Sequence, residues 1–553
     1  MRIDRRTFLG AAALTAAIPR AAWAGELSSG QFTHGVASGD PLPTAVILWT
    51  RFMHAGDGRI AYEVAEDESF AHVVKTGGLM ASAQNDFCAK VDVRGLRPGR
   101  RYFYRFLSAS GYSDVGRTIT APANSAQSLS IALFSCSNFP FGYFHVYGHA
   151  AARDDIDLAI HCGDYIYEMQ RGNYPSDAEA VPGRVINPAT EIIHLDDYYQ
   201  RYQTYHTDAN LLELRRKKPL TVVWDDHELA NDAWRGGAQN HQPETEGLWS
   251  DRVAAASKAY FDWMPIRRPT PTGVRIYRSL DWGDLARILL LDTRLIGRDR
   301  QLDLRSTLLP QLAQGGAAAA AAAASFRANV LDDPHRTMMG AAQEAWFAET
   351  IAGSKRRGQP WQIVTQQVVM SELIAPQGYS RLLPATASDG LRQYVVAGEA
   401  LSALHMPFNM DAWSGYPAAR ARLLAACARH GANAVVLGGD SHNFWAANHG
   451  DAGHLSAVEF AGGSVTSPGL EHNLTNAQPG QREQLMLGAN PQLATVDLTN
   501  KGYGVLKFTR TECNAEWIAF SDVKQPTAPT PTVLRLASAA SANAGPGAWS
   551  IAT

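Results

Sequence analysis

The chain has 553 residues, more than one compact core usually holds, so its length predicts two domains or one domain with large insertions. Its formal net charge is −3, 19% of its residues are charged, and no long basic stripe runs along it. Since a protein that follows a nucleic-acid backbone needs such a stripe, the sequence shows no nucleic-acid-binding surface.

Residues 1–24 have the features of an export signal. A basic start is followed by the apolar stretch Phe8 to Ile18 and by Ala22-Trp23-Ala24, a small-residue cleavage signal. The apolar stretch is shorter than the about 20 residues that span a bilayer, which argues against a permanent membrane anchor. Arg5-Arg6 resembles a twin-arginine signal, used by proteins exported already folded. We expect a mature chain that begins at Gly25, uses the twin-arginine machinery as a partner, and is periplasmic or secreted.

Residues 25–122 are predicted to form a small all-β domain of the immunoglobulin or fibronectin type III kind. Short alternating apolar and polar segments are separated there by Gly, Pro and Asp turns, which is typical of an antiparallel β-sandwich. Leu96 to Gly99 followed by Tyr102 resembles the tyrosine corner of such domains. The polar connector Ala121 to Ser128 marks the expected boundary.

Residues 129–525 show strand-length apolar runs alternating with helical patterns, which predicts an α/β domain. The expected strands are Ile131 to Phe134, Leu158 to His161, Leu220 to Trp224, Leu285 to Leu291, Gln362 to Thr365, Ala434 to Leu437 and Ala457 to Phe460. The expected helices are residues 196–217, 250–264, 340–353 and 418–431.

Two biased segments are assigned outside this core. The alanine tract Ala317 to Ala324 is interpreted as part of an insertion. Residues 526–553 form a Pro/Ala/Ser-rich tail, which we expect to be weakly ordered at least in part.

Ligand-type side chains follow four of the predicted strands. The segments are Ser135 to Asn138, Cys162 to Glu168, Asp225 to Glu228 and Gly438 to Asn443. Each feature has a structural explanation when taken singly: acidic residues after a strand can cap a helix, a cysteine or tyrosine can pack in a core, and a histidine can be buried. If the four strands share one sheet edge, however, the crowded carboxylates repel unless cations lie between them. The pattern therefore predicts a polynuclear metal site.

The spacing of Asp164 and Tyr167 suggests which metal is bound. In a helical turn, residues three apart share a face, and Tyr165 would lie on another. A phenol loses its proton near neutrality only to a strong Lewis acid, so ferric iron fits better than magnesium. The five cysteines are too few and scattered for a disulfide framework, and their odd number leaves at least one free thiol.

At these residues the chain resembles the alkaline phosphatase D (PhoD-like) family of metallophosphatases, within the calcineurin-like superfamily. The resemblance covers roughly Phe32 to Asp522 and rests on the landmarks HGVASGDPLPTAVILWTR, FSCSN, HCGDYIYE, WDDHELAND, LLDTR, GAAQEAWF, QQVVMSEL, DAWSGYPAARARLL, GGDSHNF and NPQLATVDLTNKGYG. It implies a metallophosphatase-type β-sandwich flanked by helices (αββα), which follows the small β domain in the chain.

The resemblance also implies one Fe3+ and two Ca2+ ions as cofactors. The implied iron ligands are Cys136, Asp164, Tyr167 and His442, with Asp164 bridging to calcium. The implied calcium ligands are Asp226, Asp440 and Asn231, while Asp225 is a further ligand or a partner of the ligands. His227 is implied as a phosphate contact or leaving-group acid, and Arg294 as a phosphate clamp or a structural ion pair.

The expected function is hydrolysis of phosphomonoesters and phosphodiesters by metal-activated hydroxide or oxide. Two alternatives are retained. Cys136 could be the nucleophile of a cysteine hydrolase with a histidine base. The chain could also be a non-catalytic exported protein that binds wall polymers or polysaccharides through its β-sandwich, with a structural calcium.

Overall fold

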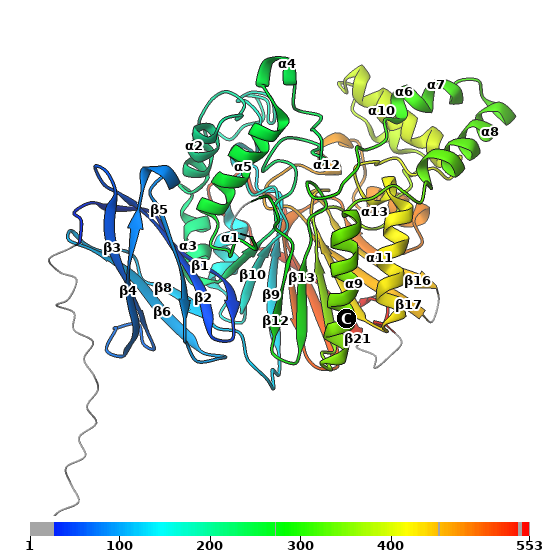
Figure 1. Cartoon of the computed structure of the whole chain (residues 1–553). Helices are drawn as coiled ribbons and strands as arrows, with labels where there is room; N and C mark the ends of the chain where they lie inside the picture. Colours follow the sequence, from blue (N-terminus) through cyan, green and yellow to red (C-terminus); the bar gives the residue numbers. More distant parts are fainter. Residues whose placement is uncertain (1–26, 271–272, 452–453, 540–544, 552–553) are drawn as a thin grey trace, which may run out of the picture.

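The structure is a computed structural model that describes residues 27–270, 273–451, 454–539 and 545–551 (Figure 1). The predicted export signal, residues 1–24, lies outside this part of the chain. No helix in the described ranges combines the length and apolar character that crossing a membrane requires.

In the described part of the chain, the N-terminal domain contains eight strands. They are β1 Gln31–Leu42, β2 Ala45–Met53, β3 Gly58–Ala65, β4 Val73–Ala81, β5 Cys88–Arg94, β6 Arg101–Ser108, β7 Gly111–Tyr112 and β8 Gly116–Ile119. Strands β1, β2 and β5 face the sheet of β3, β4, β6, β7 and β8 across a core that includes Leu48, Phe52 and Tyr104. The hydroxyl oxygen of Tyr102 accepts a hydrogen bond from the backbone N–H of Arg97 at 2.9 Å, so the predicted tyrosine corner is present.

One sheet of this domain continues into the larger domain. Strand β1 pairs in parallel with β11, Leu220–Val222, through Gly39 and Leu220. A β-carbon at Gly39 would lie 2.1 Å from the carbonyl oxygen of Leu220, so only glycine allows this approach. The next residue, Asp40, is buried and accepts hydrogen bonds from Arg278 at 2.8 and 3.0 Å. The β domain is therefore joined to its neighbour through a shared sheet.

Two sheets form the larger domain. The ten-stranded sheet has the order β22-β21-β20-β19-β9-β10-β11-β1-β2-β5, where β9 is Leu129–Phe134, β10 Leu158–His161, β19 Lys501–Phe508, β20 Glu512–Phe520, β21 Thr532–Ala539 and β22 Ser550–Ile551. The seven-stranded sheet has the order β12-β13-β14-β15-β17-β16-β18, where β12 is Arg278–Trp282, β13 Ala286–Leu290, β14 Trp361–Thr365, β15 Asn433–Gly438, β16 Phe444–Asp451, β17 His454–Gly462 and β18 Leu493–Asp497. All seven predicted strands are confirmed.

The two sheets pack against each other through apolar side chains. The ring of Trp517 on β20 lies 5.3 Å from that of Phe444 and 5.8 Å from that of Phe460, both on the other sheet. Successive residues of a strand point to opposite faces, and accordingly Val435 of β15 belongs to this shared core whereas Val436 packs with the outer helices. The continuous apolar runs of the sequence are explained by burial on both faces.

Helices cover the outer faces. Helices α9, Gly340–Arg356, and α11, Pro417–Arg429, lie on the seven-stranded sheet (Figure 1). The side of the ten-stranded sheet is covered by α1 His145–Ala152, α2 Leu195–Tyr205, α3 Ala209–Lys217 and α5 Trp249–Trp263. Further helices are α4 Pro243–Glu246, α12 Leu470–Asn473 and α13 Gln481–Ala489. The predicted helix 196–217 is divided, because Asp208 accepts from the backbone N–H groups of Asn210 and Leu211 and so caps α3.

A helical lobe projects from this body at the upper right of Figure 1. It comprises α6 Leu304–Thr307, α7 Leu309–Leu312, α8 Gly316–Phe326 and α10 Asp389–Ser402. Phe326 and Leu401 belong to its own small core, separate from the cores of the sheets. The alanine tract forms α8, and its Ala323 belongs to this small core and not to the cores of the sheets.

The tail departs from expectation. Strand β21 pairs along its length with β20, and Trp549 is buried and donates from Nε1 to the carbonyl oxygen of Glu459 at 2.8 Å. The prediction of weak order is therefore wrong for Thr532–Ala539 and for residues 545–551. The Pro/Ala/Ser bias concealed the strand pattern of Thr532 to Leu536. This segment pairs with β20 and so satisfies the backbone hydrogen-bonding groups at the edge of that strand.

Candidate metal centre

The four predicted strand ends meet, although their strands do not share one sheet. Strands β9, β10 and β11 belong to the ten-stranded sheet and β15 to the seven-stranded one, so the expectation of a single sheet edge is wrong. The ends come together because the sheets are stacked and the loops after their strands touch. A β-carbon at Gly439, just after β15, would lie 2.5 Å from the β-carbon of Ser135, just after β9. Glycine at this position therefore permits the contact.

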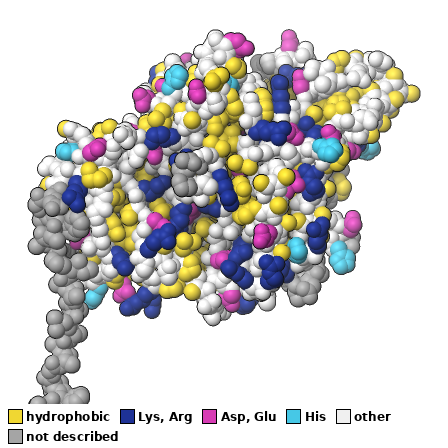
Figure 2. All heavy atoms as spheres, in the orientation of Figure 1, with side chains coloured by type: hydrophobic (Ala, Val, Ile, Leu, Met, Phe, Trp, Pro, Cys, Tyr) yellow, Lys and Arg dark blue, Asp and Glu magenta, His cyan; other side chains and the backbone are white. Residues whose placement is uncertain are grey.

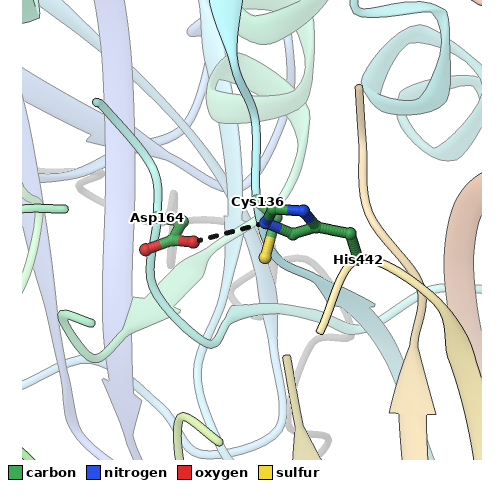
Figure 3. Close-up of side chains that lie close together, drawn as sticks. All are labelled: Cys136, Asp164 and His442. Atoms are coloured by element: carbon green, nitrogen blue, oxygen red, sulfur yellow. Dashed lines mark ion pairs between the residues drawn. The ribbon is translucent and has the colours of Figure 1, made fainter. Parts of the chain in front are cut away.

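Cys136, Asp164 and His442 form the first candidate ligand group. One possible ligand atom from each residue lies within 4.8 Å of those of the other two. Figure 3 shows the three side chains converging, with Nε2 of His442 3.9 Å from Oδ2 of Asp164. The Nδ1 atom of His442 lies 2.8 Å from the carbonyl oxygen of Pro468, which can only accept, so Nδ1 carries the proton. Nε2 is thereby left with a lone pair for a metal.

The backbone at these residues is unusual. Cys136, Asp164, Asp440 and His442 have φ angles of 59°, 55°, 61° and 61°, in the left-handed region that non-glycine residues rarely adopt. Such conformations persist only where the surroundings enforce them, and they cluster at functional sites. Four of the predicted metal ligands share this feature.

Tyr167 points at the same group. Its hydroxyl donates to Oδ2 of Asp164 at 3.1 Å and lies 3.3 Å from Nε2 of His442 and 2.6 Å from Oγ of Ser467. Tyr165 points away, with its hydroxyl 2.9 Å from Nε2 of His206 in the core. The predicted division of the two tyrosines is confirmed, although this segment consists of bends and not of a helical turn.

Carboxylates extend the site beyond this group. Two further sets of ligand atoms fall within the same 4.8 Å limit, one from Asp164, Asp226 and His227 and one from Asp225, Asp226 and Asp440. The three sets are linked, because Asp164 and Asp226 each belong to two of them. This arrangement suits bridging carboxylates between neighbouring cations.

The residues present fit bound cations. The buried oxygens Oδ1 of Asp164, Oδ2 of Asp225 and Oδ1 of Asp226 have no hydrogen-bond donor among the described residues. Burial raises the pKa of Asp225 and of Asp440 well above the usual range, against the opposing charge of Arg294. Burial, followed by the charge of Asp164, also raises the pKa values of the Cys136 thiol and the Tyr167 phenol. Cations would satisfy the oxygens and favour the deprotonated donors.

Arg294 lies in the middle of the acidic residues and is fully buried. Its Nε donates to Asp225 at 2.5 Å, its Nη1 to both oxygens of Asp411 at 2.8 and 2.9 Å, and its Nη2 to Asp440 at 3.2 Å. Nη2 also lies 3.4 Å from Asp226. Every guanidinium nitrogen thus faces a carboxylate. This arrangement matches the structural ion pair, which was one of the two roles expected for Arg294. The other role, a phosphate clamp, stays a prediction.

The ring of His227 packs against that of Tyr167. Its ring centroid lies 4.2 Å from that of Tyr167, and its Nδ1 donates to Glu168 at 2.6 Å. Burial lowers the pKa of His227, but the charges of Glu168 and Asp164 outweigh burial and raise that pKa well above its usual range. Asn231 donates from its backbone N–H to Glu168 and from Nδ2 to Gln239, so its predicted place among the calcium ligands stays a prediction.

Comparison with known proteins identifies the family. The family described as PhoD-like phosphatase matches residues 131–517.

The chain belongs to the PhoD-like phosphatase family.

The N-terminal domain of the same family matches residues 17–122. Alkaline phosphatase D of Bacillus subtilis (strain 168) is 33% identical over 465 residues, which is 80% of this chain and 70% of the relative. A solved structure described as "Structure of PhoD" superposes with a TM-score of 0.75 at 28% identity, covering 95% of this chain and 93% of that one. The resemblance seen in the sequence and the α/β fold are confirmed, and this PhoD-like phosphatase is a phosphoesterase.

Sequence reasoning missed several residues of the PhoD-like phosphatase site. Glu228 accepts from the backbone N–H groups of Asp164, Tyr165 and Asp225 at 3.0, 2.5 and 2.6 Å, so it ties two ligand loops together. Burial raises the pKa of Glu228 to about 8. Glu168 and Asp411 have comparable supporting roles. All three acidic residues stand inside the landmarks HCGDYIYE, WDDHELAND and DAWSGYP, but their partners are distant in sequence.

Proposed function

We propose that this PhoD-like phosphatase is a metal-dependent enzyme that hydrolyses phosphomonoesters and phosphodiesters. The observation that carries the proposal is the linkage of three buried ligand groups through Asp164 and Asp226, with oxygens that lack donors. Fe3+ would be held by Cys136, Asp164, Tyr167 and His442. Ca2+ would be held by the oxygen donors of Asp226, Asp440, Asn231 and Asp225.

The donor chemistry supports this division. Thiolate, phenolate and imidazole are electron-rich donors that suit a ferric ion, whereas carboxylate and amide oxygens suit calcium. The bound cations would supply Lewis-acid activation of the attacking oxygen and neutralise charge on the phosphoryl group. The two stacked sheets with outer helices correspond, in this proposal, to the metallophosphatase-type αββα sandwich.

The chain's own residues would orient and protonate the substrate. Glu168 holds Nδ1 of His227, which leaves Nε2 to contact the phosphate or to donate a proton to the leaving oxygen. Glu168 also favours the protonated ring, the state that a general acid needs. Arg294 would keep the carboxylates of Asp225 and Asp440 in place as their counter-ion.

The cysteine-nucleophile alternative is less well supported. Cys136 is fully buried, and burial with the charge of Asp164 raises the pKa of its thiol, so a free thiolate is disfavoured. Membership of a phosphatase family disfavours the non-catalytic alternative.

We further propose that the basic and apolar N-terminus directs the enzyme to the periplasm or outside the cell through the twin-arginine machinery.

The proposal is tested with purified protein and two substrates, p-nitrophenyl phosphate and bis(p-nitrophenyl) phosphate. Both should be hydrolysed, and a calcium chelator should abolish turnover until calcium is restored. Alkylating reagents should leave turnover of the metal-loaded enzyme intact, because Cys136 would be a buried ligand. Inactivation by alkylation with the metal content untouched would instead support the cysteine nucleophile.

A further inference from the structure

A cavity of about 640 Å³ lies between the acidic residues of the metal centre and the helical lobe. Asp232, Asp411 and Asp440 line it on the side of the metal centre. On the lobe side its wall is formed by Leu302, Leu309, Tyr394, Ala397, Phe408 and Met410. We call this space the lobe cavity. It begins at a predicted metal ligand, Asp440, and extends away from it along the lobe.

The lobe side of the cavity presents an aromatic surface. The rings of Tyr394, on α10, and Phe408 are in edge-to-face contact, with centroids 4.2 Å apart. Tyr394 is 45% exposed, although the protein buries most of its large aromatic side chains. Figure 2 shows hydrophobic side chains gathered over the projecting lobe. An exposed ring beside a cavity can pack against a flat or apolar group.

Several polar lining groups bond to the protein itself, whereas Oε1 of Gln301 has no hydrogen-bond donor among the described residues. Nε2 of Gln301 donates to the carbonyl oxygen of Asp232 at 2.9 Å, and Oδ1 of Asn409 accepts from the backbone N–H of Asp411 at 2.9 Å. Asp303 caps α6 by accepting from the backbone N–H of Arg305 at 3.0 Å. A polyol would need partners for each of its hydroxyls, whereas an apolar group would need none of these atoms.

We propose that the lobe cavity binds the leaving-group alcohol of the phosphoester, and that this alcohol carries an aromatic or extended apolar moiety that packs on Tyr394 and Phe408. The inference rests on the proposed function, which places the phosphoryl group beside Asp440. A volume of about 640 Å³ falls in the range of small-molecule sites and exceeds what a phosphate alone would need. Arg305 lies 6.0 Å over the ring of Tyr394, at the lobe side of the cavity.

The test compares two ligands that cannot be hydrolysed, 1-naphthylmethylphosphonate and methylphosphonate, by titration calorimetry on the metal-loaded full chain. The wild type should bind the naphthyl compound at least tenfold more tightly. Tyr394→Ser should reduce this preference to less than threefold, and Tyr394→Phe, which keeps the ring, should retain it. The control is Tyr112→Ser, a 57% exposed tyrosine of the β domain, which should preserve the full preference.

A kinetic measurement accompanies the titration. The ratio of kcat/KM for 1-naphthyl phosphate to that for glycerol 2-phosphate should fall about tenfold in Tyr394→Ser. Two results would overturn the lobe-cavity proposal even if the enzyme turns over esters. One is equal affinity of the wild type for the two phosphonates, and the other is an equal loss of affinity for both phosphonates in Tyr394→Ser. A tenfold preference without turnover of any ester would uphold the cavity and overturn the proposed function.

Discussion

The Nδ1 atom of His227 donates a hydrogen bond of 2.6 Å to the carboxylate of Glu168, and both side chains are buried beside Tyr167. This contact fixes which ring nitrogen carries the first proton and raises the pKa of the imidazole. If His227 donates a proton to the leaving group, Glu168 is the residue that positions it.

Glu168→Gln should reduce kcat about 10- to 100-fold and shift the pH dependence. Loss of the negative charge lowers the pKa of His227. The ring therefore loses its acidic proton at a lower pH, and the alkaline limb of the activity profile should move to lower pH. The measurement is a pH–rate profile of kcat. The matched control is Glu459→Gln, which alters a second buried pair, with His449 at 3.1 Å. An unshifted alkaline limb in Glu168→Gln would contradict this role.

Tyr167→Phe should shift or remove a visible absorption band and lower turnover at least tenfold. The phenolate would produce charge-transfer absorption with Fe3+, and the substitution removes only its oxygen. Tyr165→Phe is the control, because its hydroxyl points to His206 and not to the ligand group. Visible spectra and iron content of both variants provide the readout. An iron-loaded Tyr167→Phe protein with the wild-type spectrum would exclude Tyr167 as a ligand.

Arg294→Met should destabilise the protein by about 3–5 kcal/mol, because a buried charge partner is removed from several carboxylates. Calcium should restore part of the loss by neutralising the same carboxylates. Thermal unfolding with and without calcium measures the effect, and Arg429→Met, at an exposed arginine, is the control. Unchanged stability together with weaker inhibition by phosphate would favour the phosphate clamp.

Acid should destabilise the fold partly through His161. Burial lowers the pKa of His161 to about 3 from the ordinary value of 6.5, so the folded state favours the neutral ring. The stability from this group is present above pH 6.5 and is lost as pH falls toward 3. Between pH 7 and pH 5 the loss amounts to about 2 kcal/mol. The free energy of unfolding in urea is measured at both pH values for the wild type and for His161→Gln. The difference between the two pH values should be smaller in His161→Gln than in the wild type by that amount. An equal difference in both proteins would refute this role of His161.

The sequence was sufficient where the signals are local. Leu158 to His161 is a strand with the predicted bounds, and the side chains after it lie where the metal centre was expected. The division between two sheets was not predictable, because it depends on contacts such as that of Gly439 with Ser135, about 300 residues apart in the chain. Arg294 shows the same limit, since a basic residue after a strand gives no local sign of several carboxylate partners.

The linked ligand groups are proposed to hold the metal ions that hydrolysis requires. Elemental analysis of the purified protein, made in parallel with turnover of p-nitrophenyl phosphate, tests this proposal directly. We predict iron and calcium in the wild type, loss of calcium with loss of turnover in Asp226→Asn, and loss of iron in Cys136→Ser. Turnover that remains unchanged after complete removal of metal would contradict the account.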